Sequence, residues 1–281
     1  MSTDAAATFR ALHRPGQPFL LPNAWDYATA AVLVAAGFTA IGTTSLGVAA
    51  AAGLPDAHGL IRDETVALTH RLATLPCLCT VDVEAGFSDE PADVAELAAE
   101  LAEAGAVGMN LEDGRPDGTL ADPGRQDDLI RAVKQRVPAL FLNARVDTYW
   151  LGAGGLAAAL SRAERYEAAG ADGVFVPGVA AEDDIRAVVS TLTVPLNVLY
   201  LPGRHTMDRL AALGVSRVST GSLLFRTAVR TVADTAQAVR DGLPVSAEVP
   251  SYRHIQDTLL AVDVDSFDGA RTDPDVAEQE D

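Results

Sequence analysis

From residue 18 to about residue 240, the chain alternates short apolar runs with longer Ala-rich amphipathic segments. This alternation is typical of repeated βα units, which build a parallel sheet. Eight apolar runs have the length of strands: FLLPNAW (19–25), TAIGTTS (39–45), CLCTVDVE (77–84), VGMNLED (107–113), ALFLNARV (139–146), GVFVPG (173–178), PLNVLY (195–200) and SRVSTGS (216–222). Eight strands, each followed by a helix, favour a closed (β/α)8 TIM barrel over a doubly wound open sheet.

The segments between these runs carry the start and stop signals of helices. Pro91 falls in a predicted first turn, whereas Gly37, Gly105, Gly170 and Gly214 each follow an Ala- or Leu-rich run. No linker divides the chain, so we expect a single catalytic barrel domain over residues 1–241. Residues 242–281 are predicted to be a C-terminal extension, with a helix in PSYRHIQDTLLAV (250–262) and a mobile acidic tail after it.

The charge balance restricts the partners of the chain. It has 21 Lys and Arg residues against 39 Asp and Glu residues, a formal net charge of −18. Such an excess of negative charge repels nucleic acid and anionic lipid, so we expect neither as a partner. The absence of a long apolar stretch and the sparing use of cysteine, at Cys77 and Cys79 only, predict a cytoplasmic protein.

Polar residues gather where three neighbouring strands are predicted to end, which is where barrel active sites lie. Asp82 and Glu84 end the third predicted strand, Glu112 ends the fourth and Arg145 ends the fifth. Residues two apart on a strand point the same way, so these side chains should share one mouth. Alternatively, these acids are solvated strand-end residues or partners of Arg145.

Converging acids repel one another unless a cation lies between them, and hard oxygen ligands suit Mg²⁺, with Mn²⁺ as a substitute. We predict that Asp82 binds the metal directly and that Glu84 and Glu112 complete the site through water. The second strand ends in Thr43, Thr44 and Ser45, whose hydroxyl and backbone N–H groups can hold a carboxylate. Asn197, a polar residue within the seventh strand, is a candidate for direct substrate contact.

Four stretches of the chain carry a family resemblance. They are LPNAWDYATAAVLVAAGFTAIGTTSLGVAAAAGLPD (21–56), TVDVEAGFSD (80–89), GAVGMNLEDG (105–114) and LNARVDTYW (142–150). In this order and spacing they resemble the isocitrate lyase and phosphoenolpyruvate mutase superfamily, over residues 8 to 240 or so. The resemblance implies a Mg²⁺-dependent barrel that makes or breaks a C–C or C–P bond through a pyruvate-like enolate.

Carried over by position, the resemblance implies a role for each site residue. The metal is expected at Asp82, with Glu84, Glu112 and Asp56 as water-mediated outer ligands. The catalytic residues are expected to be Arg145, Asp56 and Glu112, where Arg145 meets a carboxylate or keto oxygen of the substrate. The expected substrate-binding residues are Thr44, Ser45, Leu46, Asp82, Arg145 and Asn197.

The chain departs from the resembled family in one loop. The isocitrate and methylisocitrate lyases carry a KKCGH or KRCGH loop, whereas GRPDGTLADPGRQ (114–126) has no Cys, Lys or His. We therefore expect a Mg²⁺-dependent carbon–carbon lyase, of the decarboxylase or retro-aldol type, acting on a small 2-oxo or 2-hydroxy di- or tricarboxylic acid. The alternatives are a C–P bond enzyme of the phosphonopyruvate type and a 2-oxo acid binding protein with little turnover.

Two further expectations concern chemistry and assembly. The chain has a single lysine, Lys134, in a predicted helix, which argues against a Schiff-base aldolase or isomerase. The resemblance implies a homodimer or homotetramer in which the last barrel helix, residues 222–240, is exchanged between subunits.

Overall fold

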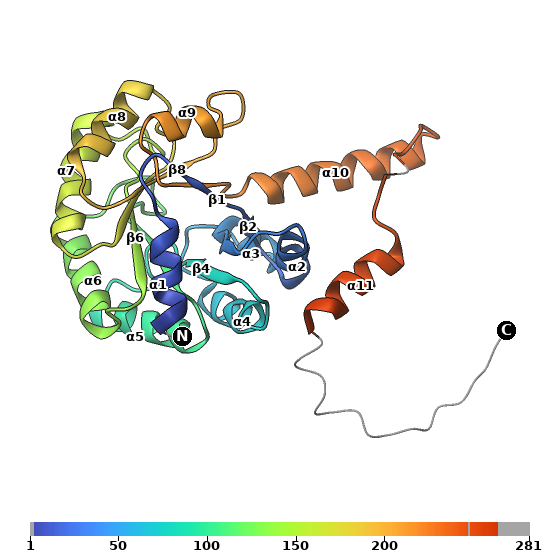
Figure 1. The fold of residues 1–281 in the computed structure, drawn as a ribbon, viewed down its shortest axis with the longest axis horizontal. Coiled ribbons are helices and arrows are strands. Elements are labelled where there is room, and N and C mark those ends of the chain that lie inside the picture. The colour runs from blue at the N-terminus through green and yellow to red at the C-terminus, as the bar shows by residue number, and fades with distance from the viewer. Residues whose placement is uncertain (1–2, 247, 264–281) are drawn as a thin grey trace, which may run out of the picture.

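A computed structural model describes residues 3–246 and 248–263, and a parallel barrel stands at its centre (Figure 1). The sheet has the strand order β1-β9-β8-β7-β6-β5-β4-β3-β2. Its strands are β1 (Phe19–Leu21), β2 (Asn23–Ala24), β3 (Ala40–Thr43), β4 (Leu78–Asp82), β5 (Gly108–Glu112), β6 (Phe141–Arg145), β7 (Gly173–Val176), β8 (Leu196–Leu199) and β9 (Arg217–Ser219). The predicted (β/α)8 barrel is therefore confirmed, with the first predicted strand divided into β1 and β2.

The division of that strand closes the barrel. Leu21 pairs with Ser219 of β9, whereas Asn23 pairs with Gly42 of β3, and Pro22 stands between them. Proline has no backbone N–H to give to a ladder, but its carbonyl still accepts from the Gly42 N–H at 2.9 Å. The buried Asn23 side chain joins both neighbours, because its Oδ1 accepts from the Thr220 and Gly221 N–H groups and its Nδ2 donates to the Thr43 carbonyl.

Helices surround the barrel as the sequence predicted. They are α2 (Tyr27–Ala35), α3 (Ser45–Ala51), α4 (Arg62–Leu72), α5 (Pro91–Glu103), α6 (Pro123–Arg136), α7 (Gly155–Ala168), α8 (Glu182–Thr191) and α9 (Met207–Ala212). Pro91 opens α5, and the four glycines predicted to end helices all have positive φ, from 87° to 109°. An apolar core between the helices and the outer face of the strands holds the two layers together.

The N-terminal end of the barrel is closed by helix α1 (Thr3–Leu12). Its fully buried Phe9 packs with Leu21, Ala40, Val107 and Phe141, which lie at or near the starts of strands. This apolar plug leaves the opposite end, where the strands finish, as the mouth of the barrel. The positions of the predicted acids are therefore at the open end.

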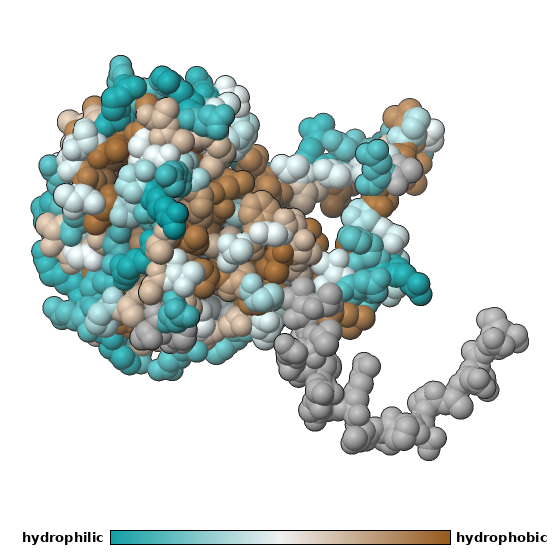
Figure 2. All heavy atoms as spheres, viewed as in Figure 1, coloured by the Kyte–Doolittle hydropathy of each residue, from teal (hydrophilic) through white to brown (hydrophobic). Residues whose placement is uncertain are grey.

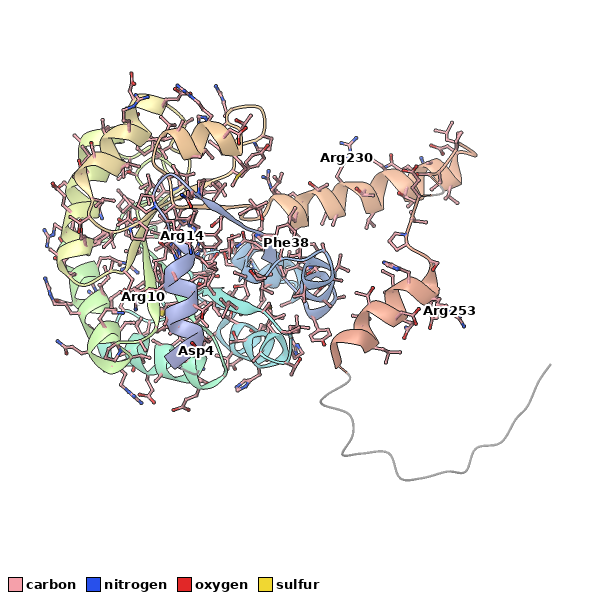
Figure 3. All side chains as sticks on the ribbon, in the orientation of Figure 1. Asp4, Arg10, Arg14, Phe38, Arg230 and Arg253 are labelled. Carbon is pink, nitrogen blue, oxygen red and sulfur yellow. The ribbon has the colours of Figure 1, made fainter. Side chains whose placement is uncertain are left out.

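Two helices follow the last strand of the barrel. Helix α10 (Leu223–Arg240) projects away and carries Arg230, and α11 (Tyr252–Asp263), which carries Arg253, returns beside α2 (Figures 1 and 3). Helix α11 confirms the helix predicted at 250–262, whereas the acidic tail predicted to be mobile lies outside the described residues. The proposed domain boundary at 241 stays a prediction.

Two further features of the described residues concern membrane-crossing helices and the cysteines. Within the described ranges, no helix has the length and apolar character needed to cross a bilayer. Both cysteines are free thiols, Cys79 buried and Cys77 partly buried.

Candidate active site

The end of β4 carries two of the predicted acids. Asp82 is its last residue, and the Asp82 N–H donates to Thr43 Oγ1 at 2.8 Å. Glu84, only 2% exposed, follows with a left-handed backbone, φ 50°. This conformation is unfavourable for a residue with a Cβ atom and is often found at functional sites. The Gly59 N–H donates to Glu84 Oε2 at 2.7 Å and fixes the carboxylate.

The segment after β3 adds Ser45 and Asp56 to this cluster. Ser45 is the first residue of α3, and its N–H donates to Asp82 Oδ2 at 3.3 Å. The Ser45 side chain hydrogen-bonds the carboxylate of Asp56, which is close enough to Asp82 to repel its charge. Asp56, which comes from another segment of the chain, therefore lies in one electrostatic cluster with Asp82 and Glu84.

The ends of β5 and β6 place an arginine between two carboxylates. Arg145 forms an ion pair through Nη1 with Glu112 Oε2, and its Nε donates to Asp147 Oδ1 at 2.7 Å. The guanidinium also lies 5.9 Å from the ring centres of both Trp150 and Phe175. One cation thus faces several buried acids at the mouth.

Burial and mutual repulsion shape the ionisation of this cluster. Burial raises the pKa of Asp56 and of Glu84, and neighbouring acids raise both further. Burial also raises the pKa of Glu112, to about 8, although Arg145 opposes the shift. The pKa of Arg145 is raised above its ordinary value because Glu112 and Asp147 outweigh the effect of burial. Without a cation, these carboxyl groups are therefore harder to ionise than isolated ones.

The sequence of the chain matches that of a known protein family. The sequence profile of the phosphoenolpyruvate phosphomutase family matches residues 9–240. The chain belongs to this family. The superfamily resemblance of the four motif stretches is confirmed, and because the family comprises lyases and mutases, the chain belongs among enzymes.

Two relatives show the range of the family. An uncharacterized protein of Mycobacterium tuberculosis is 44% identical over 254 residues, covering 90% of this chain and 96% of that protein. The 2-methylisocitrate lyase of Bacillus subtilis is 33% identical over 205 residues, covering 69% of this chain and 66% of that enzyme.

Two solved structures share the fold of this family member. A putative lyase/mutase from Burkholderia cenocepacia is 36% identical with a TM-score of 0.83, covering 90% of this chain and 95% of that one. A phosphonopyruvate hydrolase in complex with oxalate and Mg²⁺ is 25% identical with a TM-score of 0.79, covering 94% of this chain and 96% of that one.

The carboxylates of this family member can be compared with what a cation requires. Three buried oxygens, Asp56 Oδ1, Asp82 Oδ1 and Glu84 Oε1, have no hydrogen-bond partner. Buried carboxylate oxygens without partners are costly, and a hard divalent cation with its water shell would satisfy them. Among the described residues, no three His, Cys, Asp or Glu side chains are arranged to hold a metal by themselves. A metal in this cluster would therefore need water ligands as well as carboxylate oxygens.

The remaining predicted residues divide into two groups. Thr44 and Ser45 are buried at the start of α3 next to Leu46, beside Asp82, as the family resemblance implies. Asn197 lies deeper, within β8, where its Oδ1 accepts from Ser219 Oγ at 3.0 Å. It belongs to the polar filling of the barrel, so a substrate contact of Asn197 stays a prediction.

Sequence reasoning missed Arg217 in that filling. Arg217 is completely buried, and its Nη2 donates to Asn110 Oδ1 at 3.3 Å. Burial lowers its pKa to about 9, against the opposing attraction of Asp82. The sequence signal was the arginine within the predicted strand SRVSTGS, since a charged residue is rarely buried in a strand unless it is paired.

The loop 114–126 forms one wall of a cavity of about 750 Å³ beside Glu84. A bridge between Gly114 and Leu120 folds this loop back on itself, and Arg115 Nη1 pairs with Asp89 Oδ1 at 3.1 Å. His58 and Arg125 also line the cavity. A small acid bound near Asp82 would therefore have a polar space beside it.

Proposed function

We propose that the chain is a Mg²⁺-dependent carbon–carbon lyase for a small 2-oxo or 2-hydroxy di- or tricarboxylic acid. The observation that carries this proposal is the buried Arg145 facing a cluster of carboxylates whose oxygens Asp56 Oδ1, Asp82 Oδ1 and Glu84 Oε1 have no partner. The solved complex of a family relative with oxalate and Mg²⁺ supports both the cation and the acid. Mn²⁺ should replace Mg²⁺ because both prefer oxygen ligands.

Asp82 would hold the metal directly, and Glu84, Glu112 and Asp56 would hold its water ligands. A bound Mg²⁺ supplies Lewis-acid polarisation of the substrate oxygen. Arg145 would donate hydrogen bonds to the oxygen on which enolate charge develops, an interaction that is strongest in the transition state. Ser45 would bind the substrate carboxylate through its N–H and hydroxyl groups, together with Thr44 and the backbone of Leu46.

A proton must reach the enolate carbon after the bond breaks. Asp56 is well suited to this role, because burial raises its pKa toward the working range of a proton donor. The loop 114–126 offers no Cys, Lys or His for the same task. This absence favours a decarboxylase, or a retro-aldol lyase for a different acid, over the cleavage of isocitrate.

The test is a panel of oxaloacetate, isocitrate, 2-methylisocitrate, malate-type acids and phosphonopyruvate, each with Mg²⁺ and with excess chelator. Formation of a 2-oxo acid is followed by coupled reduction, and carbon dioxide and phosphate are measured in parallel. We expect Mg²⁺-dependent cleavage of at least one carbon–carbon substrate. Phosphate release from phosphonopyruvate alone would favour a C–P enzyme, and tight oxalate binding without any turnover would favour a binding protein.

We further infer that the chain forms a homodimer or homotetramer that exchanges α10. None of the 18 residues of α10 is buried, yet Val229, Val232 and Val239 form an apolar stripe on it. Apolar side chains also gather on the barrel where α10 leaves it (Figure 2). A second copy would cover both surfaces.

A further inference from the structure

Arg145 is held in place by a chain of contacts that reaches the outer helices. Its Nε donates to Asp147, and the Asp147 N–H donates to Asp113 Oδ1 at 2.8 Å. Asp113 Oδ2 accepts from Tyr166 OH at 2.7 Å and from Arg162 Nη1 at 2.9 Å, both on α7. Three buried side chains, Asp147, Asp113 and Tyr166, and the partly buried Arg162 therefore connect helix α7 to the guanidinium at the mouth.

The connection is tightly packed at each step. Asp113 and Tyr166 are completely buried, and Asp147 is 1% exposed. Gly114 leaves no room for a side chain, since a Cβ there would lie 2.5 Å from Asp147 Oδ2. The Asp147 carboxylate thus occupies the space that a side chain at position 114 would need, and it accepts there from Arg145 Nε.

Stability alone does not explain this arrangement. Buried ion pairs recover little more than their desolvation cost, and apolar side chains would fill the same space at no loss. Three buried carboxylates share two guanidinium groups here, since Glu112 and Asp147 both pair with Arg145 and Asp113 pairs with Arg162. At the mouth these contacts converge on Arg145, whose Nη1 and Nε are held by Glu112 and Asp147.

We propose that Asp147 and Asp113 are positioning residues that fix the guanidinium of Arg145 for the substrate anion, with Arg162 and Tyr166 anchoring them from α7. The identity of the substrate anion rests on the proposed function. The positioning of Arg145 does not depend on it. Two further hydrogen bonds connect the loop 114–126 to these residues. The Ala121 N–H donates to the Asp113 carbonyl, and Gln126 Nε2 donates to the Glu112 carbonyl.

Helix α7 offers a matched control. Arg165, three residues after Arg162, pairs with Asp127 on α6 at 2.7 Å, and this pair has no connection to Arg145. Arg162→Gln and Arg165→Gln each remove one guanidinium from an ion pair on α7. Arg162→Lys keeps a donor and a charge at the first position.

The test uses two measurements on the full chain. The first is the ¹⁵N–¹H resonance of Arg145 Nε, assigned by its loss in Arg145→Lys, and the second is calorimetric binding of oxalate with Mg²⁺. We expect Arg162→Gln and Asp113→Asn to shift or broaden the resonance and to weaken oxalate binding about tenfold or more. Arg162→Lys should restore most of both, and Arg165→Gln should change neither.

The outcomes separate this inference from the proposed function. An unmoved resonance and oxalate binding within twofold of the parent in Arg162→Gln would overturn the positioning role, as would equal effects of Arg165→Gln. If the resonance moves as expected but the parent protein binds no oxalate, the positioning role is supported and the proposed function is wrong.

Discussion

At the scale of single residues, the site is an excess of buried acids around one arginine. Each carboxylate has at least one oxygen fixed by a neighbour, as Glu84 is by the Gly59 N–H and Asp82 by the Ser45 N–H. The oxygens left without partners mark where the proposed cation would be held. The chemistry of the site therefore depends on side chains that the fold holds in fixed positions.

Asp82→Asn should weaken Mg²⁺ binding about tenfold or more, because it removes the charge of the direct ligand and keeps its shape. Binding is measured by calorimetry, and the far-ultraviolet circular dichroism should match that of the parent. Asp63→Asn, at a side chain 91% exposed on α4, removes the same charge elsewhere and should leave Mg²⁺ affinity within twofold. Equal Mg²⁺ affinity in Asp82→Asn and the parent would refute the ligand assignment.

The raised pKa values predict how stability and metal binding respond to pH. Because the pKa of Glu112 is about 8 in the folded protein and near 4.5 when unfolded, the folded state holds the extra proton. This proton on Glu112 stabilises the folded, metal-free protein. The stabilisation is complete below about pH 4.5 and is lost as the pH rises through 8. The Tm of the metal-free protein should therefore fall over this window.

Mg²⁺ competes with those protons, so its affinity should rise from pH 6 to pH 8.5 and binding should release protons. Calorimetry in buffers of different ionisation enthalpy measures the proton release directly. A Mg²⁺ affinity independent of pH, with no proton release, would contradict the pKa directions found for Asp56, Glu84 and Glu112.

At the scale of elements, the eight strands and their helices could be predicted because runs of fixed length and period repeat along the chain. Asp82, Glu112 and Arg145 could be placed at one mouth because parallel strands end on the same side. The contact of Asp113 with Tyr166 could not be predicted, since it spans 53 residues and depends on how α7 packs. The same holds for Arg217, whose partner Asn110 is 107 residues away.

Where the barrel closes, the Asn23 side chain joins β3 to the residues that follow β9. Asn23→Ala would leave the Thr220 and Gly221 N–H groups and the Thr43 carbonyl without that partner, so we expect a loss of about 2–4 kcal/mol in the free energy of unfolding. Urea denaturation measures it. Gln135→Ala, which removes an exposed amide on α6, should cost under about 0.5 kcal/mol. A similar small cost for Asn23→Ala would show that the seam does not hold the barrel closed.

At the scale of the whole molecule, the helix that follows the last strand, α10, projects away from the barrel (Figure 1). The amphipathic pattern of α10 predicts an apolar face but not whose barrel that face covers, because the pattern is the same in either case. Its position away from the barrel (Figure 1) fits the exchange that the family resemblance implied.

Val232→Glu should disrupt the exchange, because Val232 is 71% exposed in the single chain and would be buried by a second copy. Sedimentation equilibrium should show an oligomer for the parent and a smaller species for Val232→Glu. Thr227→Glu adds the same charge on the face of α10 that carries Arg230 and Asp234 and should leave the oligomer intact. A monomeric parent protein would contradict the exchange.

The central claim is that Asp82 holds a divalent cation and Arg145 faces the bound acid. A crystal structure with Mn²⁺ and oxalate, using the anomalous scattering of manganese, tests both at once. We predict an anomalous peak within about 2.3 Å of an Asp82 carboxylate oxygen, with oxalate bound to the ion and hydrogen-bonded to Arg145. Manganese bound elsewhere, or oxalate away from Arg145, would contradict the account.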